Sequence, residues 1–294
     1  MTRVAAVAMH STMGDVEGNL ARVEEWTRQA HARGAQFALF TEECITGSLN
    51  KSDFTLDEAR DIARGAAECS VPFLEKLCRQ LHMTLAVGTI EPAGERLRNN
   101  VLIVGPEGYL ATFGKLHLPN ANERVWFAPG ESLPVVTSQG WTFSVGICYD
   151  VRFPEIFRTA AQAGAEFFLL AVGGSGAAEK IDAEDAQREQ ALYHRELALQ
   201  LMPARAVDNA LYVFYANQCG HSGNAWFPGL CLAVGPQGEL LDEHLPDEGL
   251  IVVDVSREVV AKARVSGSCT VGEQRPEIYA HPQIVSEGGG AYAV

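Results

Sequence analysis

The sequence has few of the features that define several other classes of protein. No segment approaches the roughly 18–20 consecutive apolar residues that cross a bilayer, and the apolar stretch at residues 4–8 is too short for a signal peptide. Lys and Arg number only 23 against 37 Asp and Glu, a formal net charge of −14. Nucleic acids and anionic membranes bind basic surfaces, so this charge argues against both partners.

Paired cysteines are also lacking. The seven cysteines are Cys44, Cys69, Cys78, Cys148, Cys219, Cys231 and Cys269. They are scattered, odd in number and contain no CxxC pair, which argues against a disulfide framework or a structural zinc site. We therefore expect a cytoplasmic protein in which a single cysteine is free to act as a nucleophile.

Apolar runs suited to strands alternate with segments of helical periodicity along the whole chain. Helical spacing is found at residues 15–33, 56–67, 71–82 and 186–201. Several strand-like runs are joined only by short turns, which favours partly antiparallel sheets, whereas 116–130 carries no periodicity and is expected to be irregular. No linker divides the chain, so we expect one α/β domain at 1–285 and a flexible tail at 286–294.

Cys148 has the position of a nucleophile. It ends the apolar run 141–147 and precedes a helix that is expected to start at Pro154. Open α/β sheets expose reactive groups at such a place, and the peptide N–H groups after the turn point toward an incoming anion. A free cysteine is most often a small buried apolar residue, so position alone leaves both interpretations open.

Glu42 follows another apolar run, at 36–40. A carboxylate among core residues is partly desolvated, which raises its pKa and suits it to accept and return protons. A turn cap or a solvated loop charge is the competing interpretation. The neighbouring Glu43 is expected to point the other way, because adjacent side chains of an extended chain alternate.

Lys115 follows the strand-like run 109–113. An isolated lysine at such a place is usually a surface residue. Buried beside a thiolate, its ammonium group would stabilise that thiolate and any oxyanion formed from a substrate. Glu123, in the loop that follows, could then orient the lysine.

Three pieces of sequence combine these residues. They are Phe-Thr-Glu at 40–42 with Thr-Gly at 46–47, Lys-Leu-His-Leu-Pro at 115–119 with Phe-Ala-Pro-Gly at 127–130, and Cys-Tyr-Asp-Val-Arg-Phe-Pro-Glu at 148–155. The set resembles the carbon–nitrogen hydrolase (nitrilase) superfamily, and the resemblance extends over nearly the whole chain.

The resemblance implies a four-layer α-β-β-α sandwich with mixed sheets, and association into a homodimer or larger homo-oligomer. It implies Cys148 as nucleophile, Glu42 as general base and acid, and Lys115 as the residue that stabilises the oxyanion. Glu123 matches the supporting glutamate of the family, and the backbone N–H of Tyr149 would be a second oxyanion donor. This chemistry needs no metal and no organic cofactor.

The residues after Cys148 favour one branch of the family. Nitrile-cleaving members resemble one another in having Cys-Trp-Glu, whereas Cys-Tyr-Asp followed by Arg152 looks like the amidase and carbamoylase side. Arg152 could bind a substrate carboxylate, or it could be a structural residue beside the turn. The predicted reaction is hydrolysis of a small linear amide or N-carbamoyl compound through a Cys148 thioester, with release of ammonia or an amine.

Departures from the family pattern leave other interpretations open. Thr41 stands where the family usually has Pro, Glu43 stands where an apolar residue is common, and an unusual Gly-rich and charged segment, 172–188, is expected to border the pocket. The same site could serve a nitrilase or an acyl transferase, and a catalytically silent binding or scaffold protein could keep the fold. A Cys148–His117 mechanism is disfavoured, because the glutamate of the matching pattern already fills the role of base.

Overall fold

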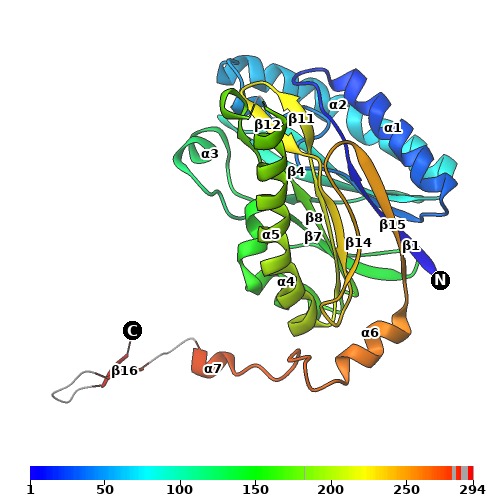
Figure 1. Ribbon diagram of the computed structural model, residues 1–294, viewed down its shortest axis with the longest axis vertical. Helices are drawn as coiled ribbons and strands as arrows, with labels where there is room; N and C mark the ends of the chain where they lie inside the picture. The colour runs from blue at the N-terminus through cyan, green and yellow to red at the C-terminus, as the bar shows by residue number, and fades with distance from the viewer. Residues whose placement is uncertain (182, 280–282, 286–290, 294) are drawn as a thin grey trace.

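The computed structural model describes residues 1–181, 183–279, 283–285 and 291–293. Two six-stranded sheets form the body of the protein (Figure 1). In spatial order, the first contains β15 (Gly249–Val255), β1 (Thr2–Ala8), β2 (Phe37–Leu39), β3 (Thr84–Ala93), β4 (Arg96–Gly105) and β5 (Gly108–Gly114). The second contains β14 (Leu240–His244), β13 (Cys231–Val234), β10 (Tyr212–Asn217), β8 (Phe167–Val172), β7 (Trp141–Ile147) and β6 (Val135–Ser138).

Strand direction determines where functional side chains gather. The inner strands β1, β2 and β3 are parallel, as are β7, β8 and β10, while the outer neighbours pair antiparallel. The mixed sheets predicted from the short turns are thereby confirmed. Because parallel strands end at the same edge of a sheet, the segments that follow them lie close together there.

The strands are apolar on both faces because both faces are buried. In β1, Val4 and Ala6 face the other sheet, whereas Ala5 and Val7 face the helices. Aromatic rings fill much of the space between the sheets: the ring of Phe37, on β2, packs edge-on against Phe143 and Phe167 of the second sheet, with centroids 5.8 and 5.3 Å apart. This packing fixes the distance between the two sheets, and with it the distance between the loops that leave them.

Helices cover the outer face of each sheet, which completes the predicted α-β-β-α sandwich (Figure 1). They are α1 (Val16–Ala32) and α2 (Leu56–Leu81) on the first sheet, and α4 (Pro154–Gln162) and α5 (Glu184–Asn209) on the second. Side-chain caps begin two of them: Asp15 accepts from the backbone N–H of Gly18, and Thr55 forms a capping box with Glu58.

Three expectations about helices were wrong. The two helices predicted at 56–67 and 71–82 are one, α2, since its buried face continues past Pro72, which lies inside the helix. In the same way, the helix predicted at 186–201 does not end there: as α5 it continues through Pro203 to Asn209. A proline removes one backbone hydrogen bond, and burial of the apolar face outweighs that loss. The segment 116–130 is also not wholly irregular, because it contains α3 (Ala121–Trp126).

The remaining elements lie at the ends of the sandwich. A small sheet consists of β9 (Gly176–Ala177), β11 (Cys219–Ser222) and β12 (Ala225–Pro228). After α6 (Arg257–Arg264) the chain passes along α4, where Thr270 accepts a hydrogen bond from Arg158 and Gln274 accepts one from Gln162, to α7 (Pro276–Tyr279) and the hairpin of β16 (Gln283–Val285) and β17 (Ala291–Ala293) (Figure 1). Most of the tail predicted at 286–294 lies outside the described residues. No helix in the described ranges is long and apolar enough to cross a membrane.

Candidate active site

The residues singled out in the sequence converge at one edge of the sandwich. Glu42 follows β2, Lys115 directly follows β5, and Cys148 directly follows β7. The ammonium of Lys115 donates hydrogen bonds of 2.8 Å to Oε1 of Glu42 and of 2.8 Å to Oε2 of Glu123. Lys115 and Glu42 are buried. The lysine thus bridges two carboxylates that are far apart in the sequence.

Cys148 stands at the start of a tight turn, the 3₁₀ helix Cys148–Arg152. Its φ of 46° is uncommon for a residue other than glycine, and such backbone strain occurs preferentially at functional sites. The pKa of the thiol is raised to about 12: burial is the main cause and the Glu42 carboxylate adds to it, while Lys115 acts in the opposite direction. The sulfur is therefore a neutral thiol at neutral pH, and it needs a base before it can attack.

Glu42 lies close to this thiol as a charged carboxylate. Burial alone would raise its pKa, but the ammonium groups of Lys115 and Lys51 outweigh burial, and the pKa of Glu42 is lowered. The increase expected from the sequence was wrong for this reason. The Oε1 atom accepts from Lys115 and, at 2.8 Å, from Asn99. Oε2 lies against Gly173, where an added Cβ would come within 2.9 Å of it.

Glu43 does not point away from Glu42, in contrast to the prediction for an extended chain. Its φ is 55°, in the left-handed region. The turn passes so close to Gly88 that a Cβ there would lie 2.5 Å from the Glu43 nitrogen. Both carboxyl groups therefore reach the same amide: Asn99 Nδ2 donates to Glu42 at 2.8 Å and to Glu43 Oε1 at 3.0 Å.

Several contributors to the site carried no signal in the sequence. Lys51 belongs to the 3₁₀ helix Leu49–Lys51, donates to the Gly173 carbonyl at 2.9 Å, and lowers the pKa of both Glu42 and Glu43. Gln218, which follows β10, donates to the Glu42 carbonyl. Neither residue belongs to a recognisable motif; Lys51 comes from the segment after β2, and the close approach of the two sheets brings Gln218 to the site.

His117 is occupied by a carboxylate and is not paired with the cysteine. Its Nδ1 lies 2.7 Å from Oδ1 of the buried Asp150, and its ring stacks on Phe153. The second carboxylate oxygen of Asp150 accepts from the backbone N–H of Ile147 at 3.0 Å. This pair ties the segment after Lys115 to the turn of Cys148, so it holds the two parts of the site together.

A small cavity of about 210 Å³ opens beside Cys148. Its walls come from the turn at Cys148, the loop after β8 and helix α5, and they are mainly apolar. The lining residues are Pro119, Cys148, Tyr149, Val151, Arg152, Val172, Gly174, His194, Leu197, Ala198, Leu201 and Tyr215. Burial lowers the pKa of His194 to about 4, so its ring is neutral. The segment 172–188 thus borders the cavity, as the sequence predicted.

The residues predicted as supporting lie beside the nucleophile. Glu123 is in contact with Lys115, and the Asn120 side chain caps the short helix that carries it. Tyr149 and Arg152 line the cavity. The exposed guanidinium of Arg152 lies 5.8 Å over the Tyr149 ring, and no carboxylate pairs with it among the described residues.

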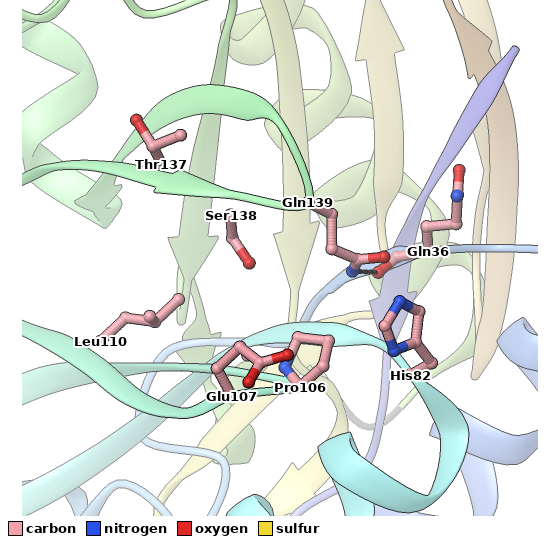
Figure 2. A pocket seen from close by; sticks show the side chains of 9 residues that line it. Gln36, His82, Pro106, Glu107, Leu110, Thr137, Ser138 and Gln139 are labelled. Carbon is pink, nitrogen blue, oxygen red and sulfur yellow. Dashed lines mark hydrogen bonds between the residues drawn. The ribbon is translucent and has the colours of Figure 1, made fainter.

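A larger cavity, of about 450 Å³, has different chemistry. Figure 2 shows Gln36, His82, Glu107 and Gln139 around it. It lies near the other ends of the strands, where β2 and β7 begin, and its described lining contains no cysteine and no lysine. The cavity at Cys148 is therefore the better candidate for a nucleophilic reaction, although it is the smaller of the two.

Replacing Lys115 by Met is expected to destabilise the protein by about 3–5 kcal/mol at pH 8, because two buried carboxylates lose their ammonium partner. The loss should be smaller at pH 5. In the variant the pKa of Glu42 is no longer held down, so at lower pH the carboxyl takes up a proton and its burial is less unfavourable. Thermal unfolding at both pH values measures this, with the exposed Lys76→Met as the control. Equal melting temperatures for the Lys115 variant and wild type at pH 8 would contradict the proposed burial of charge.

Comparisons with known proteins agree with this geometry. The family model for carbon-nitrogen hydrolases matches residues 3–265. The chain is 27% identical over 282 residues to a nitrilase of Pyrococcus abyssi, covering 95% of this chain and 99% of that protein. It is 25% identical over 287 residues to an N-carbamoylputrescine amidase of Oryza sativa, covering 95% and 94%.

A solved structure is also similar. It is a mutant of the amidase from Nesterenkonia sp. AN1 in which acrylamide has added to the active site cysteine, with a TM-score of 0.72, 27% identity, and coverage of 90% of this chain and 97% of that chain. These matches agree with the four-layer fold and with the cluster of Glu, Lys and Cys at its edge. The chain belongs to the carbon–nitrogen hydrolase family and is an amidase-type hydrolase, as the resemblance of its sequence predicted.

Proposed function

We propose that this protein hydrolyses small linear amides whose acyl chain is apolar where it lies in the cavity, using Cys148 as nucleophile, Glu42 as base and acid, and Lys115 as oxyanion stabiliser. The observation that carries the proposal is the bridge from Lys115 to Glu42 and Glu123, next to a cysteine that opens into a small apolar cavity. The nitrilase, the N-carbamoylputrescine amidase and the amidase among its relatives all act on carbon–nitrogen bonds by name, which supports the reaction class.

The first half of the reaction follows from the charge states. Cys148 is a thiol and Glu42 a carboxylate, so Glu42 takes the thiol proton as sulfur attacks the carbonyl carbon. Negative charge then develops on the carbonyl oxygen. The Lys115 ammonium and the backbone N–H of Tyr149 are the donors that would stabilise it. Lys115 keeps its charge throughout: burial would lower its pKa, but the surrounding acidic groups raise it well above its usual value.

The second half reverses the proton transfers. Glu42 gives its proton to the nitrogen of the tetrahedral intermediate, the C–N bond breaks, and ammonia or an amine leaves. A thioester on Cys148 remains. Glu42 then removes a proton from water as the water oxygen attacks the thioester, and returns that proton to the Cys148 sulfur as the C–S bond breaks, which releases the carboxylic acid and restores the thiol. Glu123 acts through Lys115 and keeps its ammonium in place.

The cavity walls favour an apolar acyl group. None of its described lining residues is Asp or Glu, so an ammonium group on the substrate would find no counter-ion there. Its volume of about 210 Å³ is below the roughly 300–1,000 Å³ typical of pockets for drug-sized ligands. Arg152, exposed at the rim, is the residue we propose for binding a carboxylate when the acyl chain carries one at its far end.

The experiment compares three classes of compound with a matched carbon skeleton: short aliphatic amides, an N-carbamoyl diamine, and the corresponding nitriles. Ammonia release is expected to be fastest from the amides. A mono-amide of a dicarboxylic acid should lose activity in Arg152→Met more than a plain aliphatic amide does. No ammonia from any compound would refute the proposed function, and acid formed faster from nitriles than from amides would make the protein a nitrilase.

Two further expectations from the sequence stay predictions. The first is a homodimer or larger homo-oligomer, which sedimentation analysis would test. The second is a cytoplasmic location, which fractionation of cells that express the protein would test.

A further inference from the structure

We propose that Glu43 is a second functional carboxyl group: through the amide of Asn99 it positions Glu42, and it holds a proton in the active enzyme. This inference rests on the proposed function of Glu42. It concerns a residue for which the reaction outlined above has no role.

The first argument is geometric. Asn99 is buried, and a side-chain amide nitrogen has two hydrogens. One is donated to Oε1 of Glu42 and the other to Oε1 of Glu43. With Lys115 also donating to Oε1 of Glu42, this oxygen is held by two donors, and Oε2 is left to exchange a proton. If Glu43 were lost, Asn99 would have an unused donor and could rotate away from Glu42.

The second argument is the backbone. Glu43 has a φ of 55°, an uncommon conformation for a side chain of this size. Glycine at position 88 provides the space for it, since a Cβ there would lie 2.2 Å from the Thr41 carbonyl oxygen. Strain of this kind persists where the surrounding structure enforces it, and here it turns the Glu43 carboxyl toward Asn99.

The third argument is charge. Three carboxyl groups gather at the site, those of Glu42, Glu43 and Glu123, against the two ammonium groups of Lys51 and Lys115. Each lysine can balance one carboxylate, so a third negative charge would have no partner. Burial also raises the pKa of Glu123, but Lys115 donates directly to Glu42 and Glu123, whereas Glu43 accepts no hydrogen bond from either lysine among the described residues, so Glu43 is the one better kept neutral.

The titration of Glu43 follows from these surroundings. The pKa of Glu43 is raised to about 8: burial is the main cause and the Glu42 charge adds to it, while Lys51, the Ser48 hydroxyl and Lys115 act in the opposite direction. Below pH 8 Glu43 is protonated and adds no negative charge to the site. Above pH 8 Glu43 becomes an anion beside Glu42 and opposes the negative charge that develops on the substrate oxygen. Activity should therefore fall as pH rises through this range.

The test compares the pH profiles of wild type, Glu43→Gln and Glu43→Leu with a short aliphatic amide. For a group titrating near pH 8, wild-type kcat should fall roughly tenfold from pH 7 to pH 9. Glu43→Gln, which is neutral at any pH and keeps the acceptor for Asn99, should lose that fall. Glu43→Leu should lower kcat about tenfold at pH 7 with little change in KM. Glu107→Gln, an exposed change, is the control that should keep the wild-type profile.

A readout that does not require activity accompanies the kinetics. Infrared spectra should contain the carbonyl stretch of a protonated carboxyl at pH 7 that is missing at pH 10 and missing in Glu43→Gln. Two results in an active enzyme would overturn the inference. One is a Glu43→Gln variant whose kcat still falls from pH 7 to pH 9, and the other is a Glu43→Leu variant with the wild-type kcat. Wild-type protein that cleaves no amide at any pH, yet has the Glu43 band, would instead locate the failure in the proposed function.

Discussion

Cys148→Ala protein is expected to lose amide hydrolysis by a factor on the order of 10⁴ or more, because removal of a nucleophile removes the covalent route entirely. The remaining groups can bind and polarise the substrate but form no thioester. The change should leave the fold intact, since the side chain lines a cavity and is not packed on all sides. Ammonia release under saturating amide measures the effect, with circular dichroism as the check on folding.

Cys69→Ala is the matched control for this variant. Cys69 lies exposed on α2, away from the carboxyl ends of the strands. The Cys69→Ala variant should therefore retain full activity. Alkylation mapped by mass spectrometry adds a second test. A small haloacetamide, which resembles the substrate, should label Cys148 in wild type and should do so more slowly when a competing amide is present. Near wild-type hydrolysis by Cys148→Ala would exclude the cysteine mechanism.

Glu42→Gln is expected to slow amide hydrolysis by a factor of about 10²–10⁴, the usual contribution of a general acid–base group. The same change should make acylation by an activated ester possible. The Glu42 charge raises the pKa of the Cys148 thiol and Lys115 lowers it, so removing that charge leaves the thiol beside the ammonium with a lower pKa. An ester with a good leaving group needs no proton from Glu42, so the acyl group should transfer and then remain.

A nitrophenyl ester of a short aliphatic acid tests whether the Glu42→Gln variant is acylated but not deacylated. The variant should release close to one equivalent of nitrophenol and then stop, and mass spectrometry should find the acyl group on Cys148. Glu68→Gln, an exposed change on α2, should turn over the ester as wild type does. Continuous turnover by Glu42→Gln at the wild-type rate would show that water is activated by another group.

Much of the site could be read from local sequence. Cys148 and Lys115 directly follow apolar runs, and Glu42 lies just beyond one, which places all three at strand ends whatever the rest of the fold. The interpretations of Glu42 and Glu43 that relied on neighbours in the chain were the ones that failed. The pKa of Glu42 depends on ammonium groups 9 and 73 residues away, and the direction of Glu43 depends on a positive φ that Gly88 permits.

By itself, the sequence determined the layered α/β fold, the family, and the identity of the nucleophile, base and oxyanion donor as predictions, because periodicity and short motifs are local properties of a chain. Only the tertiary structure decided which charges share a buried space. Asn99 reaches Glu42 from β4 of the same sheet and Lys51 from the segment after β2, whereas Gln218 reaches it from the second sheet, because the two sheets pack face to face and end at the same edge. Electrostatic energy depends on the distance between charges and on their burial, and neither quantity can be deduced from the local sequence.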